Sequence, residues 1–197
     1  AAEIHTITAG ERLSLPPFEV EFYAVCHSIP DGVGLAITTP LGLVVHSGDF
    51  KFDPSPVNGQ RTDTAKLAEL GQRGVLLLLS DSTNAEKAGR TPSESVLEET
   101  LGRIFEAAQG RVIVTTFASN ISRIQQVINT SARFGRQVAI TGRSMVSNFR
   151  IARQLGYIHV ADEMLLPIER LKEMPDRQVT LICTGSQGEP SSALVRM

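Results

Sequence analysis

The chain has 197 residues, of which 42% are hydrophobic, and a formal net charge of −2. This length is enough for one large domain or two small ones with a real core, and the composition is typical of soluble globular proteins. The longest apolar run, Val75–Leu79, is far too short to span a bilayer and predicts a buried strand. We therefore expect no association with a membrane.

Two features predict a cytoplasmic location. The chain opens with acidic and polar residues, unlike a secretory signal. Cys26 and Cys183 lie far apart in apolar, strand-like segments, where reduced core thiols are the default.

Charge is distributed unevenly along the chain. Residues 1–84 carry 5 basic and 10 acidic side chains, whereas residues 85–197 carry 14 basic and 11 acidic. No acid occurs between Glu106 and Asp162, a stretch with seven arginines: Arg111, Arg123, Arg133, Arg136, Arg143, Arg150 and Arg153. Unopposed arginines favour a phosphate-binding surface, because the guanidinium group binds phosphates through two hydrogen bonds. The alternative is a solvated face neutralised by acids elsewhere in the fold.

The first part of the chain is predicted to be rich in strands. Apolar runs separated by turns predict strands at 19–26, 33–39 and 42–47. A short helix at 62–70 then leads into a strand at 74–80. The pattern changes after this strand, and we place a domain boundary at 84–91.

Helices and strands alternate in the second part. Thr91-Pro92-Ser93-Glu94 has the pattern of a capping box and predicts the start of a helix there. Apolar spacing extends this helix to about residue 108. The later elements are a strand at 111–117, a helix at 120–134, a strand at 137–141, a helix at 144–155 and a strand at 178–183. This alternation predicts a parallel, doubly wound α/β sheet.

His27 and Asp49 each follow an apolar strand at a turn. A side chain at a strand end is rigidly placed yet open to solvent, and imidazole and carboxylate groups are ligands for zinc or manganese. Two ligands alone do not close a metal site, so both residues could equally be ordinary polar loop residues. Strand alternation places His46 on the opposite face from Asp49, so we expect a structural or surface role for it.

Several segments occur in the order found in one family. They are Cys26–Asp31, His46–Lys51, Ser80–Asn84 and Thr184–Pro190, and Thr115–Asn120 fits the same pattern. With these segments the chain resembles ribonuclease J, the bacterial and archaeal branch of the metallo-β-lactamase nucleases that carry a β-CASP domain. The resemblance covers nearly the whole chain.

The resemblance implies an α/β fold in two parts and a chain truncated at both ends. Residues 1–84 would be the C-terminal portion of the first metallo-β-lactamase half, part of an αββα fold. Residues 85–197 would be a doubly wound β-CASP domain, truncated at its C-terminal side.

Three site residues are implied by the resemblance. His27 would bind one zinc ion, Asp49 would bridge two metal ions, and Asp81 would be the catalytic acid beside the metal cleft. These roles suit a carboxylate that bridges cations and an acid that orients a ligand or water. Each intact active site would hold two Zn²⁺ ions, with Mn²⁺ or Mg²⁺ as alternatives. The family's His-x-His-x-Asp-His signature and its two later β-CASP histidines are absent, so metal binding and catalysis by this chain alone are not expected.

Two strand-end loops are candidates for phosphate binding. In the first, Ser119, Asn120 and Arg123 lie at a predicted helix N-terminus, which favours anions. In the second, small residues would let the backbone approach a phosphate: Thr184, Gly185, Ser186 and Gly188. The alternative is that Ser and Asn cap helices and Gly makes turns without any ligand.

Together, the residues and the resemblance predict a metal-dependent ribonuclease that hydrolyses RNA phosphodiesters. It would act as a 5′-exonuclease, an endonuclease or both. Its role would be in RNA processing, including that of rRNA, and in RNA decay. The expected substrate is single-stranded RNA, and the full-length protein would be a homodimer or homotetramer. The rival hypothesis is a non-catalytic module that binds RNA or a partner chain without a complete metal site. A nucleotide-binding domain ranks last, because the chain has no Gly-x-Gly-x-x-Gly or P-loop motif.

Overall fold

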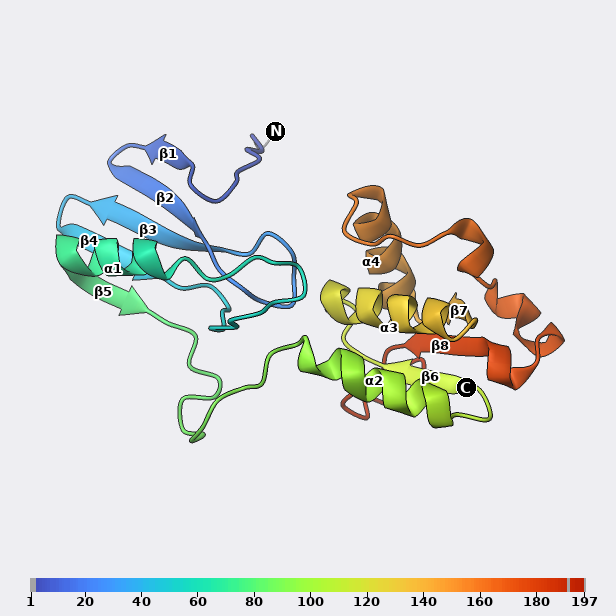
Figure 1. Cartoon of the computed structure of the whole chain (residues 1–197). Helices are drawn as coiled ribbons and strands as arrows, with labels where there is room; N and C mark the ends of the chain where they lie inside the picture. Colours follow the sequence, from blue (N-terminus) through green and yellow to red (C-terminus); the bar gives the residue numbers. More distant parts are fainter. Residues whose placement is uncertain (1–2, 191, 197) are drawn as a thin grey trace. The chain divides into compact units, whose positions relative to one another are not determined.

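A computed structural model describes residues 3–190 and 192–196. The chain forms two compact units, Ala1–Glu94 and Ser95–Met197, which Figure 1 shows in blue to green and in green to red. They are called unit 1 and unit 2 below. The division after Glu94 comes a few residues later than the boundary expected at 84–91.

Unit 1 is built on a five-stranded sheet whose strands lie in chain order. Its strands are β1 (Arg12–Leu15), β2 (Phe18–Ala24), β3 (Val33–Thr39), β4 (Gly42–His46) and β5 (Val75–Leu79). The β4–β5 pair is parallel and the others are antiparallel. Four of these strands coincide with predicted ones. The short β1 was not predicted, because it has only two apolar residues and is followed directly by two prolines.

Helix α1 (Thr64–Arg73) contributes to the core of unit 1. The Asp63 carboxylate caps it by accepting a hydrogen bond of 2.9 Å from the Lys66 backbone N–H. Leu70 of this helix is buried with residues of the strands: Tyr23, Val25, Ala36, Leu43 and Val45. The Tyr23 ring packs so closely on Gly34 that a Cβ there would lie 2.2 Å from Tyr23 Cζ.

A buried carboxylate ties the strands of unit 1 to α1. Glu21 on β2 lies 3.0 Å from Arg12 Nη2 and 2.9 Å from Lys66 Nζ, and it also pairs with Arg73. Burial by itself would raise the pKa of Glu21. The hydrogen bonds from Lys66 and Arg73 outweigh burial and lower the pKa from 4.5 to about 2. Glu21 is therefore ionised at neutral pH.

The prediction that Val75–Leu79 is a buried strand was wrong in one respect. These residues form β5, but all five side chains are exposed, by between 38% and 62%. The reason is its position: β5 lies at the end of the sheet and pairs only with β4. The run of aliphatic residues predicted a strand correctly but could not show what covers it.

Unit 2 contains a parallel sheet with the strand order β6-β8-β7, which confirms the predicted α/β fold class. The strands are β6 (Val112–Thr115), β7 (Gln137–Ile140) and β8 (Val179–Cys183). The helices are α2 (Val96–Ala107), α3 (Ile121–Arg133) and α4 (Arg143–Gln154). Short 3₁₀ helices, Asp162–Met164, Ile168–Glu173 and Asp176–Gln178, lie in the long connection before β8, where no element was predicted.

The core of unit 2 is mostly aliphatic. It joins the buried faces of α3 and α4 to the sheet through Ile124, Val127, Val138, Met145 and Ile182. One charged side chain, Arg136, is also buried, and it donates hydrogen bonds to the carbonyl oxygens of Ala108, Gly110 and Val179. A buried donor of this kind needs such partners to offset its lost hydration.

The predicted capping box does not start a helix. Helix α2 begins at Val96 with Ser95 as its N-cap, and Ser95 makes no side-chain capping bond. Ser93 and Glu94 bond instead to Ser55 and Asp53, which belong to the same unit 1. The prediction failed because a tertiary partner took the groups that would have capped the helix.

Both cysteines, Cys26 and Cys183, are buried as free thiols, and burial raises the pKa of each. None of the helices formed by residues 3–190 and 192–196 combines the length and the apolar character needed to cross a membrane.

Candidate functional site

Three predicted site residues of unit 1 follow strands that end on the same side of the sheet. Strands β2 and β4 are both antiparallel to β3 and thus run in one direction, and β5 is parallel to β4. His27, Asp49 and Asp81 come just after the carboxyl ends of β2, β4 and β5. The topology therefore brings together residues that are far apart in sequence. The carboxyl ends of strands are where α/β sheets commonly bind ligands.

Asp81 is the best-positioned residue of this group. Its backbone N–H donates a 2.9 Å hydrogen bond to Oγ of Ser47, which lies in the loop after β4. Its carboxylate accepts from the backbone N–H and the hydroxyl of Thr83, at 3.0 and 2.7 Å. These bonds, the backbone N–H of Phe50 and the nearby His27 lower the pKa of Asp81. Asp81 is thus bonded to the loop that carries Asp49 and lies near enough to His27 to interact with it electrostatically.

Sequence reasoning missed Ser47, Phe50 and Thr83, which hold Asp81. Ser47 is buried although it lies in a loop, and its N–H donates to the carbonyl oxygen of Leu79 at 2.9 Å. Gly48 has a φ of +62°, and a Cβ there would lie 2.9 Å from the carbonyl oxygen of Val33. Glycine is therefore required for the turn that presents Asp49. The signals in the sequence were a serine-glycine pair after a strand and the place of all three residues in the segments His46–Lys51 and Ser80–Asn84, which carry the resemblance.

The two histidines near this site differ in their surroundings. His27 is half-buried, and its Nδ1 lies 3.5 Å from the Ser28 hydroxyl. His46 is exposed, and its Nδ1 accepts a 3.0 Å hydrogen bond from the backbone N–H of Gly48. His46 therefore uses one ring nitrogen to hold the turn before Asp49.

The residues that the structure describes do not make a metal site by themselves. Within the described ranges 3–190 and 192–196, no three or more His, Cys, Asp or Glu side chains lie close enough to hold an ion. His27 and Asp49 have suitable donor atoms for zinc, which usually takes four ligands. They could contribute to a metal centre only if further ligands came from another part of the protein.

In unit 2 the predicted phosphate loops also meet at the carboxyl ends of parallel strands. Strands β6, β8 and β7 end at Thr115, Cys183 and Ile140. The backbone pairing continues beyond them, because Thr116 N–H donates to Cys183 O at 3.1 Å and Thr141 N–H donates to Ile182 O at 3.0 Å. The loop after β6 leads into α3, and the loop after β7 leads into α4.

Asn120 caps helix α3. Its side-chain oxygen accepts a 3.1 Å hydrogen bond from the backbone N–H of Arg123, so this donor is satisfied within the chain. Ser119, the preceding residue, is half-buried. Helix α4 differs, because Gly142 at its N-cap position supplies no side-chain capping bond. The structure thus places Asn120 in the capping role that was the alternative to phosphate binding.

The loop after β8 is packed against the segment that follows it. The Thr184 hydroxyl accepts from Ala193 N–H at 3.2 Å, and Gly185 is so enclosed that a Cβ would lie 2.8 Å from Leu194 Cβ. Gly188 has a φ of +70° and an open surrounding, and Ser186 is exposed. Glu189 Oε2 accepts from the Gln187 N–H at 3.3 Å. Some of the hydrogen-bonding groups of this loop are therefore already paired within the chain.

The interpretation of seven unopposed arginines was wrong for four of them. Arg111 pairs with Asp176 at 2.7 Å, Arg133 lies 3.8 Å from Glu98, and Arg153 pairs with Asp162. Arg136 is buried against carbonyl oxygens, as described above. The acids lie outside the acid-free stretch in sequence, and folding brings them opposite the arginines. Arg143 and Arg150 lie on α4, and both side chains are exposed.

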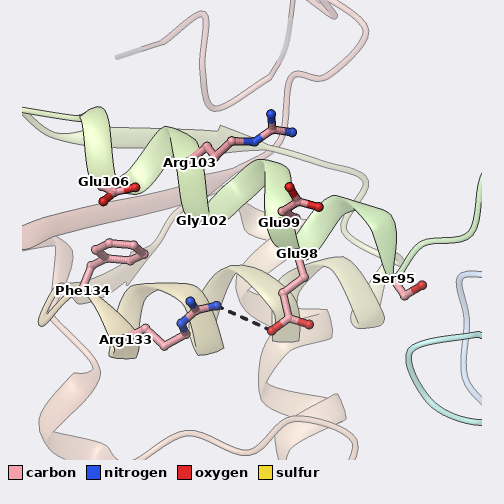
Figure 2. A pocket seen from close by; sticks show the side chains of 8 residues that line it. All are labelled: Ser95, Glu98, Glu99, Gly102, Arg103, Glu106, Arg133 and Phe134. Atoms are coloured by element: carbon pink, nitrogen blue, oxygen red, sulfur yellow. Dashed lines mark ion pairs between the residues drawn. The ribbon is translucent and has the colours of Figure 1, made fainter.

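A groove of about 590 Å³ lies between α2 and the end of α3. Figure 2 shows its acidic side chains Glu98, Glu99 and Glu106 and its basic side chains Arg103 and Arg133, with the Phe134 ring beside them. None of the residues predicted to bind phosphate lines this groove. Its three carboxylates would repel a phosphate.

Comparisons with known proteins agree on one family. Residues 109–197 match the family described as "Ribonuclease J, beta-CASP domain". The chain is 50% identical over 198 aligned positions to "Ribonuclease J" of Thermus thermophilus, covering 100% of the chain and 34% of that protein. It is 52% identical to "Ribonuclease J" of Mycobacterium tuberculosis, covering 97% of the chain and 34% of that protein.

More distant similarities extend this comparison. The chain is 45% identical to "Ribonuclease J2" of Bacillus subtilis, over 99% of the chain and 35% of that protein. A crystal structure of a protein of unknown function from Enterococcus faecalis is 16% identical and has a TM-score of 0.65. It covers 95% of the chain and 46% of its own length, and it supports the fold alone. The chain belongs to the ribonuclease J family and spans about a third of the length of the curated relatives it matches.

Proposed function

We propose that this chain is part of a ribonuclease, as its relatives' name suggests, and that this ribonuclease depends on metal ions. The supporting observation is the convergence of His27, Asp49 and Asp81 at the carboxyl ends of three strands in unit 1. Unit 1 would belong to a metallo-β-lactamase half with an αββα fold, and unit 2 to the β-CASP domain. The substrate would be RNA, whose phosphodiester bonds the full-length protein would hydrolyse from the 5′ end, internally or both.

Each residue would have a distinct role in the full-length protein. His27 and Asp49 would supply two donors to a metal centre, together with ligands outside this chain. Bound divalent ions would polarise the phosphodiester and lower the pKa of a water molecule. Asp81 would remain ionised, because the hydrogen bonds from Thr83 and the nearby His27 lower its pKa. It would orient His27 or the attacking water from a fixed position.

Unit 2 would bind the phosphates of single-stranded RNA near the N-termini of α3 and α4. Arg123, Ser119 and the loop at 184–188 would contribute, and Arg143 and Arg150 on α4 would add long-range attraction. Because Asn120 and Thr184 already hold backbone N–H groups, the phosphate would meet the remaining donors of these loops.

A second function, RNA or partner binding without catalysis, is favoured for the 197-residue chain alone. Its described residues lack three potential metal ligands in one place. A site with two ligands should bind zinc weakly. We expect elemental analysis of the purified chain to find well under one equivalent of zinc, and a tightly held equivalent would contradict this.

The catalytic proposal is tested by Asp49→Ala in the full-length protein, in buffer with a controlled concentration of metal. We expect RNA cleavage to fall at least about a hundredfold, the effect typical of losing a residue that orients a metal centre. Glu169→Ala is the matched control, because Glu169 is exposed and belongs to unit 2, far in sequence from the three site residues. Near-normal cleavage by Asp49→Ala would remove this residue from the active site.

Four further features belong to the same proposal. They are a zinc cofactor, with Mn²⁺ or Mg²⁺ as alternatives, a role in RNA processing and decay, a dimeric or tetrameric full-length protein, and a cytoplasmic location. Metal analysis, light scattering and fractionation of cells would test the first, third and fourth of these directly.

A further inference from the structure

The last residues of unit 1 are fastened to the loop that follows Asp49. Residues 80–94 connect β5 to unit 2, and their final two residues make specific hydrogen bonds. The Ser93 hydroxyl donates to the carbonyl oxygen of Ser55 at 2.9 Å, and the Ser55 hydroxyl lies 3.1 Å from Ser93 Oγ. The Glu94 backbone N–H donates to Oδ2 of Asp53 at 3.2 Å. The chain therefore leaves unit 1 from a held position.

Asp53 is the centre of this attachment. Its side chain is only 1% exposed, and its Oδ1 accepts a 2.9 Å hydrogen bond from the backbone N–H of Ser55. Lys51 Nζ lies 3.4 Å from Asp53 Oδ2 and 3.4 Å from Glu94 Oε1. Burial would raise the pKa of Asp53. Hydrogen bonds from Ser93, Ser55, Glu94 and Lys51 outweigh burial and lower the pKa to about 2.

The same loop is bonded to the strand end that carries His27. Lys51 N–H donates to the carbonyl oxygen of Cys26 at 2.8 Å. The buried Thr62 hydroxyl donates to Lys51 O at 2.8 Å and accepts from Cys26 N–H at 2.9 Å. A continuous set of hydrogen bonds thus runs from Ser93 and Glu94 to the neighbours of both Asp49 and His27.

We propose that Asp53 is a positioning residue that fastens the end of the 80–94 linker to the Asp49 loop, so that the linker and this loop are held or released together. An ionised, buried carboxylate suits this role, because removing it leaves Lys51 and the Glu94 N–H without their buried acceptor. The attachment does not depend on what the site binds, so it goes beyond the proposed catalytic function.

The first test is limited trypsin digestion of the full-length protein carrying Asp53→Asn. The linker contains two exposed cleavage sites, after Lys87 and Arg90. We expect cleavage there to become about tenfold faster, because proteolysis follows the population of the opened segment and the removed hydrogen bonds involve a charged group. Cleavage after Arg177, in unit 2, should not change. Glu86→Gln is the matched control, because it removes one exposed linker charge without touching the attachment.

The second test separates positioning from general stability. Ser93→Ala weakens the attachment from the linker side and leaves Asp53 in place. Ser93 bonds directly to Ser55, so the informative residues are those further from it in the same loop. If the two segments are held together, hydrogen exchange should accelerate by at least about threefold in residues 47–51. A residue that only stabilised the fold locally would not transmit this effect. Ser93→Ala also keeps the test valid if Asp53→Asn does not fold.

Two results would overturn the proposal. One is unchanged linker cleavage in Asp53→Asn and in Ser93→Ala at unaltered melting temperature. The other is exchange in residues 47–51 that is the same in Ser93→Ala as in the unsubstituted protein. Cleavage that rises equally after Arg177 in both variants would also count against it, since this would show a loss of overall stability. RNA cleavage enters none of these readouts, so failure of the catalytic proposal would be distinguishable.

Discussion

The two units handle polar groups in opposite ways. Unit 1 buries ionised carboxylates, Glu21 and Asp53, and leaves Asp49 exposed where its strands end. Unit 2 has a mostly aliphatic core, and its strand-end loops use Asn120 and Thr184 for bonds within the chain. The comparison indicates that the stability of unit 1 depends on charge. It also indicates that a ligand of unit 2 must bind to loops whose donors are partly occupied.

The largest effect is expected from crowding the core of unit 1. Gly34→Ala would place a Cβ 2.2 Å from Tyr23 Cζ, so the Tyr23 ring must move, and its hydroxyl would lose the hydrogen bond to His46 O. We expect a loss of about 3 kcal/mol in the free energy of unfolding. Urea denaturation monitored by tyrosine fluorescence measures it.

The control for this substitution is Gly71→Ala in α1. Nothing lies within 4 Å of a Cβ at Gly71, and alanine is favoured in helices. This variant should be about 0.5 to 1 kcal/mol more stable. An equal loss at both positions would show that the close packing of Tyr23 on Gly34 is not the cause.

The second prediction concerns acid. The pKa of Glu21 is lowered from 4.5 to about 2 by Lys66 and Arg73 despite burial. A carboxyl group whose pKa is lowered by folding stabilises the folded state. This contribution is fully present above about pH 4.5 and is lost as the pH falls to about 2. We expect Glu21→Gln to cost about 3 kcal/mol at neutral pH and almost nothing near pH 2. Unfolding measured from pH 7 to pH 2 checks this.

A comparison with unit 2 makes the acid test sharper. Its buried ion, Arg136, is held by neutral carbonyl groups, and burial lowers its pKa from its ordinary value, which lies far above this range. Unit 1 should therefore show the steeper loss of protection in hydrogen exchange as the pH falls from 4.5 to 2. Equal slopes in the two units would contradict the contrast drawn here.

The third prediction separates capping from phosphate binding at Asn120. Asn120→Ala should cost about 1 kcal/mol of stability, because the N–H of Arg123 loses its acceptor. Asn120→Asp should keep the cap and the stability but place a negative charge beside the proposed phosphate site. We therefore expect Asn120→Asp to bind single-stranded RNA more weakly, as measured by fluorescence anisotropy. Unchanged RNA affinity would restrict Asn120 to the capping role.

The smallest effect on stability is expected on α4. Arg143→Gln with Arg150→Gln should change the free energy of unfolding by less than about 0.5 kcal/mol, because neither side chain is buried. If both bind phosphates, the salt dependence of RNA binding should flatten by about 0.7 for each phosphate that the variant no longer neutralises. Titrations at several salt concentrations measure this slope.

A matched control uses arginines that already have acidic partners. Arg111 pairs with Asp176 and Arg133 lies near Glu98. Arg111→Gln with Arg133→Gln removes the same formal charge, and we expect little change in the salt slope. Equal slopes for the two double variants would show that only net charge matters.

The secondary structure could be predicted almost completely from the sequence. Apolar periodicity located β2 to β8 and all four α-helices of the described residues, because the spacing of buried residues is a local property of strands and helices. The alternation after residue 95 also predicted the parallel sheet of unit 2. The positions of His27 and Asp49 just beyond strands follow from the same local pattern, although their roles stay predictions.

Which side chains meet was decided only by the tertiary structure. The acids Glu98, Asp162 and Asp176 lie outside the acid-free stretch, yet folding places them against its arginines. Thr91-Pro92-Ser93-Glu94 has the pattern of a capping box, but Ser93 and Glu94 bond to Ser55 and Asp53 instead. Strand β5 has the composition of a buried strand and is exposed at the end of its sheet. Periodicity records how a segment folds along its own axis, whereas pairing and burial depend on segments far away in the chain.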